Sequence, residues 1–188
     1  MSTVLMEQRK RIHPHKFTLW VGIGSILMMF AGLTSAYIVK RNQPNWQSFE
    51  LPTFFWYSTV AILISSATMY LALNAFKARE MAKYRNLVTV TLLLGIAFTA
   101  FQALGFYQLY QQGTALGKTV SVDFLYVIVG LHGAHVVGGI VALLVLFFKA
   151  FSAKTRMYNS VPVELVSIYW HFVDILWIYL LLFLLMIK

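Results

Sequence analysis

Two long apolar stretches of the chain contain ionisable side chains near their middles. His171 and Asp174 lie within the run 161–187, and His132 and His135 lie within the run 124–148. An aspartate at the centre of a membrane-spanning helix costs roughly 2.5–3.5 kcal/mol, so such groups are usually functional or paired. Three kinds of chemistry suit these residue types: a metal or haem site, a proton path, and hydrogen bonds between helices.

The polar groups of the last run fall on one side of a helix. At about 100° per residue, Glu164, His171 and Asp174 lie within one narrow stripe, whereas Trp170 and Trp177 lie off it. A shared stripe allows these groups to meet a neighbouring helix together. Of the three interpretations, we favour hydrogen bonds that hold the last two helices together, because side chains of this kind commonly bond across helices.

The two histidines of the preceding run also share a side. His132 and His135 are three residues apart, which places both on roughly the same side of a helix. If this helix runs antiparallel to the last one, a rise of about 1.5 Å per residue brings His135 and Asp174 to similar depths. The sequence therefore supports the hypothesis of a hydrogen bond between His135 and Asp174.

The composition identifies the class of protein. Of the 188 residues, 60% are hydrophobic and 11% are charged, too apolar a mixture for a soluble domain of this size to cover with a wettable surface. We therefore expect an integral membrane protein. The absence of cysteine excludes disulfides, iron–sulfur clusters and thiolate metal sites. The net charge of +9 lies in the segments between apolar runs, so it predicts topology and does not indicate a nucleic-acid partner.

The apolar runs predict an all-α fold, a bundle of five transmembrane helices. Each run is long enough to cross a bilayer, and loops with turn-forming or charged residues separate them. We expect a basic tail over residues 1–16 and one transmembrane domain over 17–188, with helices at about 17–39, 53–76, 86–110, 124–148 and 162–187.

The lysines and arginines predict the orientation of this bundle. Eleven of them fall in the tail and in the loops after the second and fourth helices, and four fall on the other side. Because cytoplasmic loops carry the excess of positive charge, we expect a cytoplasmic N-terminus and a C-terminus outside.

Small residues line parts of two predicted helices. In lipid, such residues let helix backbones approach closely, so we interpret them as packing positions. Room for a ligand, a lipid chain or a gas path is the alternative. The positions are Ser25 and Gly32 in the first helix and Gly130, Gly133, Gly138 and Gly139 in the fourth.

Two longer motifs resemble a known family. The run FLYVIVGLHGAHVVGG at 124–139 is followed by Glu164 and by YWHFVDILW at 169–177, in that order on the last two helices. Together they resemble subunit III of the haem-copper cytochrome c oxidases. The segment SILMMFAGLTSAY at 25–37 is similar to the third helix of that family. The chain resembles the five-helix bacterial form, which lacks the first two helices of longer members.

The resemblance implies a non-catalytic core subunit of a terminal oxidase in aerobic respiration, in the bacterial cytoplasmic membrane. Such a subunit binds no haem or copper itself; these lie in partner subunits. It packs against the large catalytic subunit I beside other oxidase subunits, holds phospholipids, sustains proton uptake and turnover, and has been proposed to line an oxygen route. The family's polar positions are filled here by His132, His135, Glu164, His171 and Asp174.

Two positions depart from the family pattern. Ile26 stands where a carboxylate often follows the serine, and Gly105 stands at an acidic position after Gln102. The resemblance therefore carries no proton-handling role to either position. The electron donor is determined by other subunits, and no residue of this sequence indicates the haem type or membership of a larger respiratory assembly. A stand-alone proton-coupled transporter or a quinol-interacting membrane protein is the alternative function.

Overall fold

The computed structural model describes residues 14–41, 51–111, 113, 117, 119–152 and 160–187. Within these ranges the chain is all-helical, and each of its five helices is long and apolar enough to cross a membrane. The expected all-α bundle with five membrane-spanning helices is thereby confirmed. The helices are α2 (Pro14–Lys40), α3 (Phe54–Lys77), α4 (Met81–Gln111), α5 (Val120–Phe151) and α6 (Val161–Met186).

Several helices extend beyond their apolar runs. Helix α2 begins at Pro14, so the last residues assigned to the basic tail are helical, and α4 begins at Met81 instead of residue 86. Hydropathy marks only the apolar part of a helix, whereas long charged side chains let a helix continue beyond it. Proline at the first position of a helix is a known start signal, and Pro14 occupies that position in α2. Residues 1–13 of the predicted tail lie outside the described residues.

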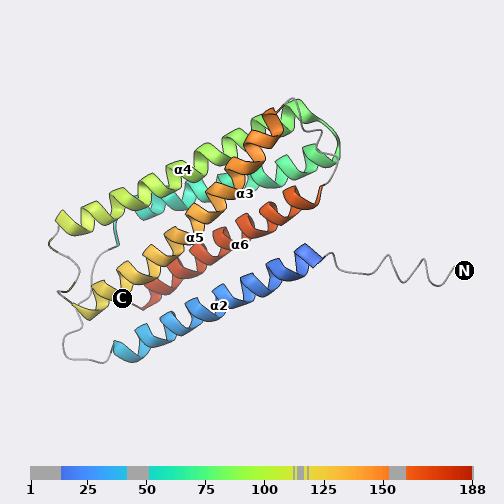
Figure 1. Ribbon diagram of the computed structural model, residues 1–188. Coiled ribbons are helices and arrows are strands. Elements are labelled where there is room, and N and C mark those ends of the chain that lie inside the picture. Colours follow the sequence, from blue (N-terminus) through green and yellow to red (C-terminus); the bar gives the residue numbers. More distant parts are fainter. Residues whose placement is uncertain are drawn as a thin grey trace, which may run out of the picture.

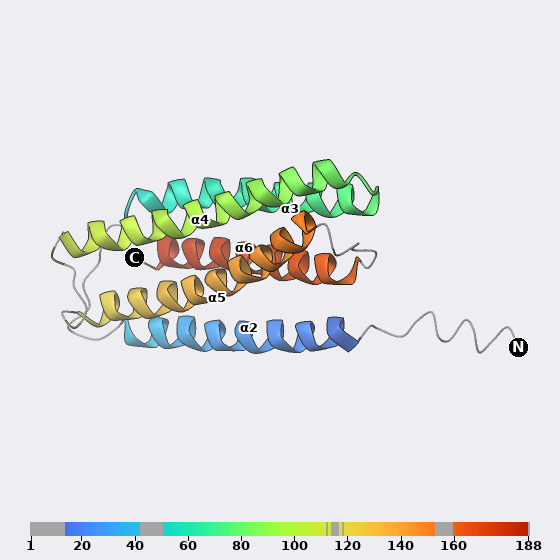
Figure 2. The same cartoon turned by 45° about the horizontal axis from the view of Figure 1, so that its top comes forward.

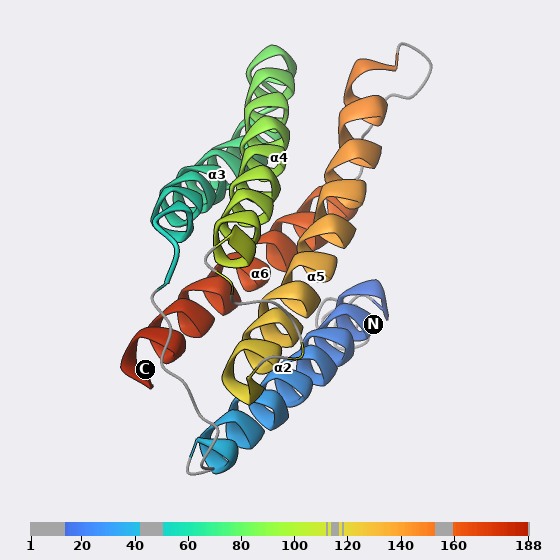
Figure 3. The same ribbon diagram turned by 90° about the vertical axis from the view of Figure 1, so that its left-hand side faces the viewer.

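Helix α6 occupies the centre of the bundle. It packs against α2, α3 and α5, whereas α2 packs only against α5 and α6 among the described helices. Figure 1 and Figure 2 show the α3–α4 pair on one side and α2 on the other, with α5 and α6 between them. Figure 3 shows the same order from the end of the bundle. The central position of α6 brings its side chains into contact with all four other helices.

Two tryptophans of α6 fill the middle of the core. Trp170 and Trp177 are the largest fully buried side chains in the described part of the chain. The ring of Trp170 lies against two helices at once, because a Cβ added at Gly95 would lie 2.8 Å from its Cη2 and one added at Gly139 would lie 2.9 Å from its Cε3. These glycines of α4 and α5 therefore make room for the ring.

Candidate functional site: the polar groups of helix α6

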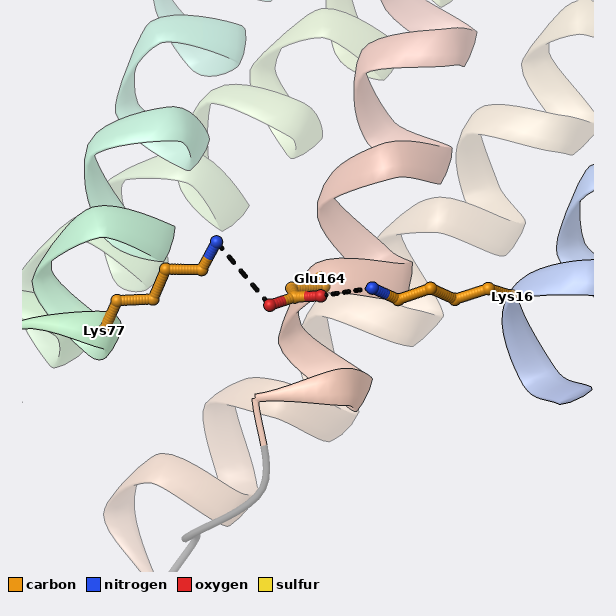
Figure 4. Close-up of polar contacts among 3 residues, drawn as sticks. All are labelled: Lys16, Lys77 and Glu164. Carbon is orange, nitrogen blue, oxygen red and sulfur yellow. Dashed lines mark hydrogen bonds and ion pairs between the residues drawn. The ribbon is translucent and has the colours of Figure 1, made fainter. Parts of the chain in front are cut away.

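Glu164 joins three helices at one end of the bundle. It lies in the first turn of α6, where its Oε2 accepts a hydrogen bond from Lys16 Nζ of α2 at 2.6 Å. Its Oε1 lies 3.5 Å from Lys77 Nζ of α3. Figure 4 shows the carboxylate between the two ammonium groups. The sequence places Glu164 on a polar stripe but does not reveal its partners, since Lys16 is 148 residues away.

Removing the charge of Glu164 should loosen α2 from α6. We expect Glu164→Gln to cost about 1 kcal/mol or less, because both lysines are partly exposed to solvent. The measurement is the distance distribution between spin labels on Met28→Cys and Ile175→Cys, two exposed positions in a chain without native cysteine. The distribution should broaden for this variant and stay narrow for Glu80→Gln, since Glu80 pairs only locally with Lys83. Equal distributions for both variants would contradict the three-helix role.

Other polar side chains of α6 bond to hydroxyl groups of α3. These contacts run along one edge of α6, so they hold α6 against α3. The sequence predicted instead that the polar groups would hold α6 against α5. The contacts are His171 Nδ1 to Ser66 Oγ at 2.7 Å, Trp170 Nε1 to Ser65 Oγ at 3.1 Å and Trp177 Nε1 to Thr59 Oγ1 at 3.0 Å.

The predicted hydrogen bond between His135 and Asp174 is wrong. Neither carboxylate oxygen of Asp174 has a hydrogen-bond partner among the described residues, although the side chain is only 2% exposed. The Ser66 hydroxyl approaches the carboxyl closely enough for a weak hydrogen-bonding contact, although outside standard geometry. His135 Nδ1 instead bonds to Leu131 O of its own helix at 2.7 Å.

The direction of Asp174 explains the error. On a helical wheel, Asp174 lies between Trp170 and Trp177 on one side and His171 on the other, and all three of these side chains bond to hydroxyls of α3. The carboxyl is thus turned toward α3 although its depth matches that of His135. The link between α5 and α6 at this depth comes from Tyr169, whose hydroxyl donates to His135 O at 3.0 Å.

His132 is enclosed by aromatic rings. The side chain is fully buried, and neither ring nitrogen has a hydrogen-bond partner in the described part of the chain. Its ring stacks on Trp177 of α6, with centroids 5.3 Å apart. Phe30 of α2 and Phe98 of α4 meet it edge-on, with centroids at 6.4 and 6.1 Å. The two histidines of the α5 motif therefore have different surroundings.

The predicted packing glycines also differ from one another. Gly139 lies against the Trp170 ring, and a Cβ at Gly138 would meet Tyr169 Oη at 3.7 Å. The hydroxyl of Ser25 donates to Val21 O within α2. The remaining three face open space, with no described atom within 4 Å of an added Cβ: Gly32, Gly130 and Gly133.

The ionisable groups do not gather into a ligand cluster. Within the described ranges, no three side chains of the histidine, aspartate and glutamate type lie close enough together to hold a metal ion. The metal interpretation of the two motifs therefore gains no support from their geometry.

A groove of about 550 Å³ lies between α2 and α6. It begins beside His15 and Thr18, close to the Lys16–Glu164 pair, and is mainly apolar further along. Ile26, the position where the family often has a carboxylate, lines this groove.

Comparison with known proteins identifies the family. The model of cytochrome c oxidase subunit III matches residues 18–187, almost the whole chain. The chain belongs to the cytochrome c oxidase subunit III family. As a member, it is a multi-pass membrane protein and a subunit of an oxidase complex with other subunits.

Relatives of this subunit III chain come from several bacteria. The probable cytochrome c oxidase subunit 3 of Nocardia farcinica is 32% identical over 180 residues, which cover 90% of this chain and 89% of that protein. The cytochrome c oxidase subunit 3 of Bacillus sp. strain PS3 is 26% identical over 166 residues, which cover 86% and 80%. The probable subunit 3 of Mycobacterium leprae is 32% identical over 162 residues, which cover 84% and 80%.

Gly105, the other position that departs from the subunit III pattern, has no room for a side chain. A Cβ at Gly105 would lie 2.6 Å from Cε1 of Phe55 and 2.9 Å from its Cδ1. Phe55 is fully buried and packs edge-on against Trp177 at 5.6 Å, so it cannot move aside easily. An acidic side chain at position 105 would not fit in this chain.

Proposed function

We propose that this chain is a non-catalytic subunit of a haem-copper terminal oxidase in the bacterial cytoplasmic membrane, where it packs against the large catalytic subunit I. The proposal rests on the contacts that the ionisable side chains of this chain make with neighbouring helices. Glu164 and His171, which the family motif retains, bond to Lys16, Lys77 and Ser66 on neighbouring helices. Groups committed to such contacts hold the bundle together, which is the role expected of a supporting subunit.

Docking on partner subunits would use the open faces of α2 and α5. An added Cβ at Gly32, Gly130 or Gly133 would meet no described atom within 4 Å, and Val137 and Val141 of α5 are exposed. Small and flat surfaces of this kind let another helix approach closely within the bilayer. Packing at these glycines is therefore assigned to helices of partner subunits.

The groove between α2 and α6 suits an acyl chain. Its volume of about 550 Å³ and its apolar wall, which includes Leu19, Ile23 and Ile26, favour a hydrocarbon ligand. His15 and Thr18 line one end of the groove, where their polar groups could face a phosphate headgroup. We assign a structural phospholipid to this groove.

Support for proton uptake and oxygen access would be indirect in this chain. Ile26 and Gly105 supply no carboxylate, so the proposed support acts through packing on the catalytic subunit. The proposed orientation, with a cytoplasmic N-terminus, rests on the eleven lysines and arginines on one side against four on the other.

Purification of the tagged chain in mild detergent tests this proposal. We expect it to copurify with a large haem-bearing subunit and to show no haem absorption band after separation from that subunit. A monodisperse chain that transports protons or another solute by itself would contradict the proposal. A haem band that stays with the separated chain would contradict it as well.

A further inference from the structure

The aromatic enclosure of His132 restricts how a hydrogen-bond partner can reach its ring nitrogens. A neutral imidazole carries one N–H donor and one acceptor nitrogen, and neither ring nitrogen of His132 has a partner among the described residues. Rings cover it from three helices: Phe30 from α2, Phe98 from α4 and Trp177 from α6. A polar partner must therefore approach between these rings.

Gln102 of α4 lies at the matching depth. In the antiparallel pair of α4 and α5, Gly95 faces Ile140 and Phe106 contacts Tyr126. Counting along both helices from Gly95 and Ile140, Gln102 and His132 lie about 10.5 and 12 Å further on. Gln102 is also one turn beyond Phe98, which touches the His132 ring.

Gln102 has an unused acceptor of its own. The side chain is 6% exposed, and its Nε2 donates to Ser58 Oγ of α3 at 3.0 Å. This bond fixes the amide, yet its Oε1 is buried without a hydrogen-bond partner in the described residues. The core thus holds a carbonyl that needs a donor, level with an imidazole that needs a donor and an acceptor.

We propose that His132 and Gln102 bind ordered water in the core of the bundle. Water has two donor hydrogens and can accept as well, so one molecule can donate to Gln102 Oε1 and still bond to a nitrogen of His132. Buried polar groups in proteins are almost always bonded to a protein group or to ordered water, because an unpaired one costs about 1–3 kcal/mol. A polar site of this kind between packed helices is where internal water is found.

The site lies on α4 and α5, apart from the acyl-chain groove between α2 and α6. It differs in kind from the proposed function, because it concerns a ligand held inside this chain and requires no partner subunit. Hydration would satisfy the buried amide and imidazole while leaving the aromatic enclosure intact.

Hydroxyl-radical footprinting of the purified native assembly tests the site. X-rays generate the radicals from water, so buried residues beside bound water are modified and dry ones are not. Trp177 should be modified although it is fully buried, whereas Met69, a more reactive side chain that is equally buried in α3, should not. In Gln102→Leu, modification of Trp177 should fall to the level of Met69, and Gln102→Glu should retain it.

A high-resolution structure of the native assembly provides the direct check. Water within hydrogen-bond distance of both Gln102 Oε1 and a His132 nitrogen would support the proposal. A direct bond between the two side chains, or a dry site, would overturn it. An unmodified Trp177 in the native chain would also overturn it, and this comparison with Met69 holds even if the Gln102→Leu variant fails to assemble.

Discussion

A Gly139→Leu substitution is expected to be among the most disruptive single changes in this bundle. A Cβ at this position would lie 2.9 Å from both Cε3 and Cζ3 of Trp170, and 3.3 Å from Cε1 of Tyr169. The Trp170 ring cannot retreat, because its Nε1 bonds to Ser65 and its far edge lies against Gly95. Overpacking of this kind costs about 1–3 kcal/mol, and leucine adds atoms beyond the Cβ.

The matched control for this prediction is Gly130→Leu in the same helix. An added Cβ there meets no described atom within 4 Å, so the separated chain should keep its stability. The measurement is unfolding of each variant by titration with a denaturing detergent. Equal losses of stability at the two positions, or no loss at Gly139, would contradict the role of Gly139 in seating Trp170.

An Asp174→Leu substitution should shorten the active life of the oxidase during turnover. The carboxyl is 2% exposed and lies near the Ser66 hydroxyl, which bonds to His171. Leucine removes the polar group beside that pair, and the loss of one hydrogen-bonding contact costs about 0.5–1.5 kcal/mol. The contact between α3 and α6 should loosen, and the assembly should lose activity after fewer turnovers at an unchanged initial rate.

Asp174→Asn is the control for this second prediction, since it keeps the shape and the hydrogen-bonding capacity of the side chain. Its assembly yield and lifetime should stay near those of the native protein. Unchanged yield and lifetime for Asp174→Leu would contradict the prediction. An equal loss in both variants would show that the charge of Asp174 matters and not its polar contact with the Ser66–His171 pair.

The number and type of the helices were predictable because hydropathy reports directly on membrane-spanning segments. The ends of the helices were less predictable, because Pro14 and Met81 lie in polar flanking segments into which a helix can extend. Family membership was predictable as well, because the motifs at 124–139 and 169–177 are long and occur in a fixed order.

The partners of the buried groups were not predictable from periodicity. The depth of Asp174 follows from residue counting, but the helix that it faces depends on the packing of the whole bundle. Trp170 and Trp177 show the same limit: lipid and protein core are both apolar, so hydropathy cannot distinguish a lipid-facing tryptophan from these fully buried ones. The pairing of Lys16 with Glu164 depends on tertiary structure and leaves no local pattern.

The glycines of the predicted packing positions also differ in what they face, and the sequence could not show this. A small residue permits close approach, but the sequence does not say whether the approaching helix belongs to the same chain. Gly139 faces Trp170 of α6, whereas an added Cβ at Gly130, about two and a half turns earlier in the same motif, meets no described atom within 4 Å. The partner subunits proposed here would account for the second kind.

We propose that this chain supports a catalytic subunit without supplying catalytic groups. This proposal is tested most directly by comparing the oxidase purified with and without this chain, at equal haem content, for its initial rate and for the number of turnovers before inactivation. We predict that the oxidase without the chain starts at nearly the full rate and inactivates after fewer turnovers. Loss of the initial rate with the haem centres intact, or an unchanged lifetime, would contradict a purely supporting role for this chain.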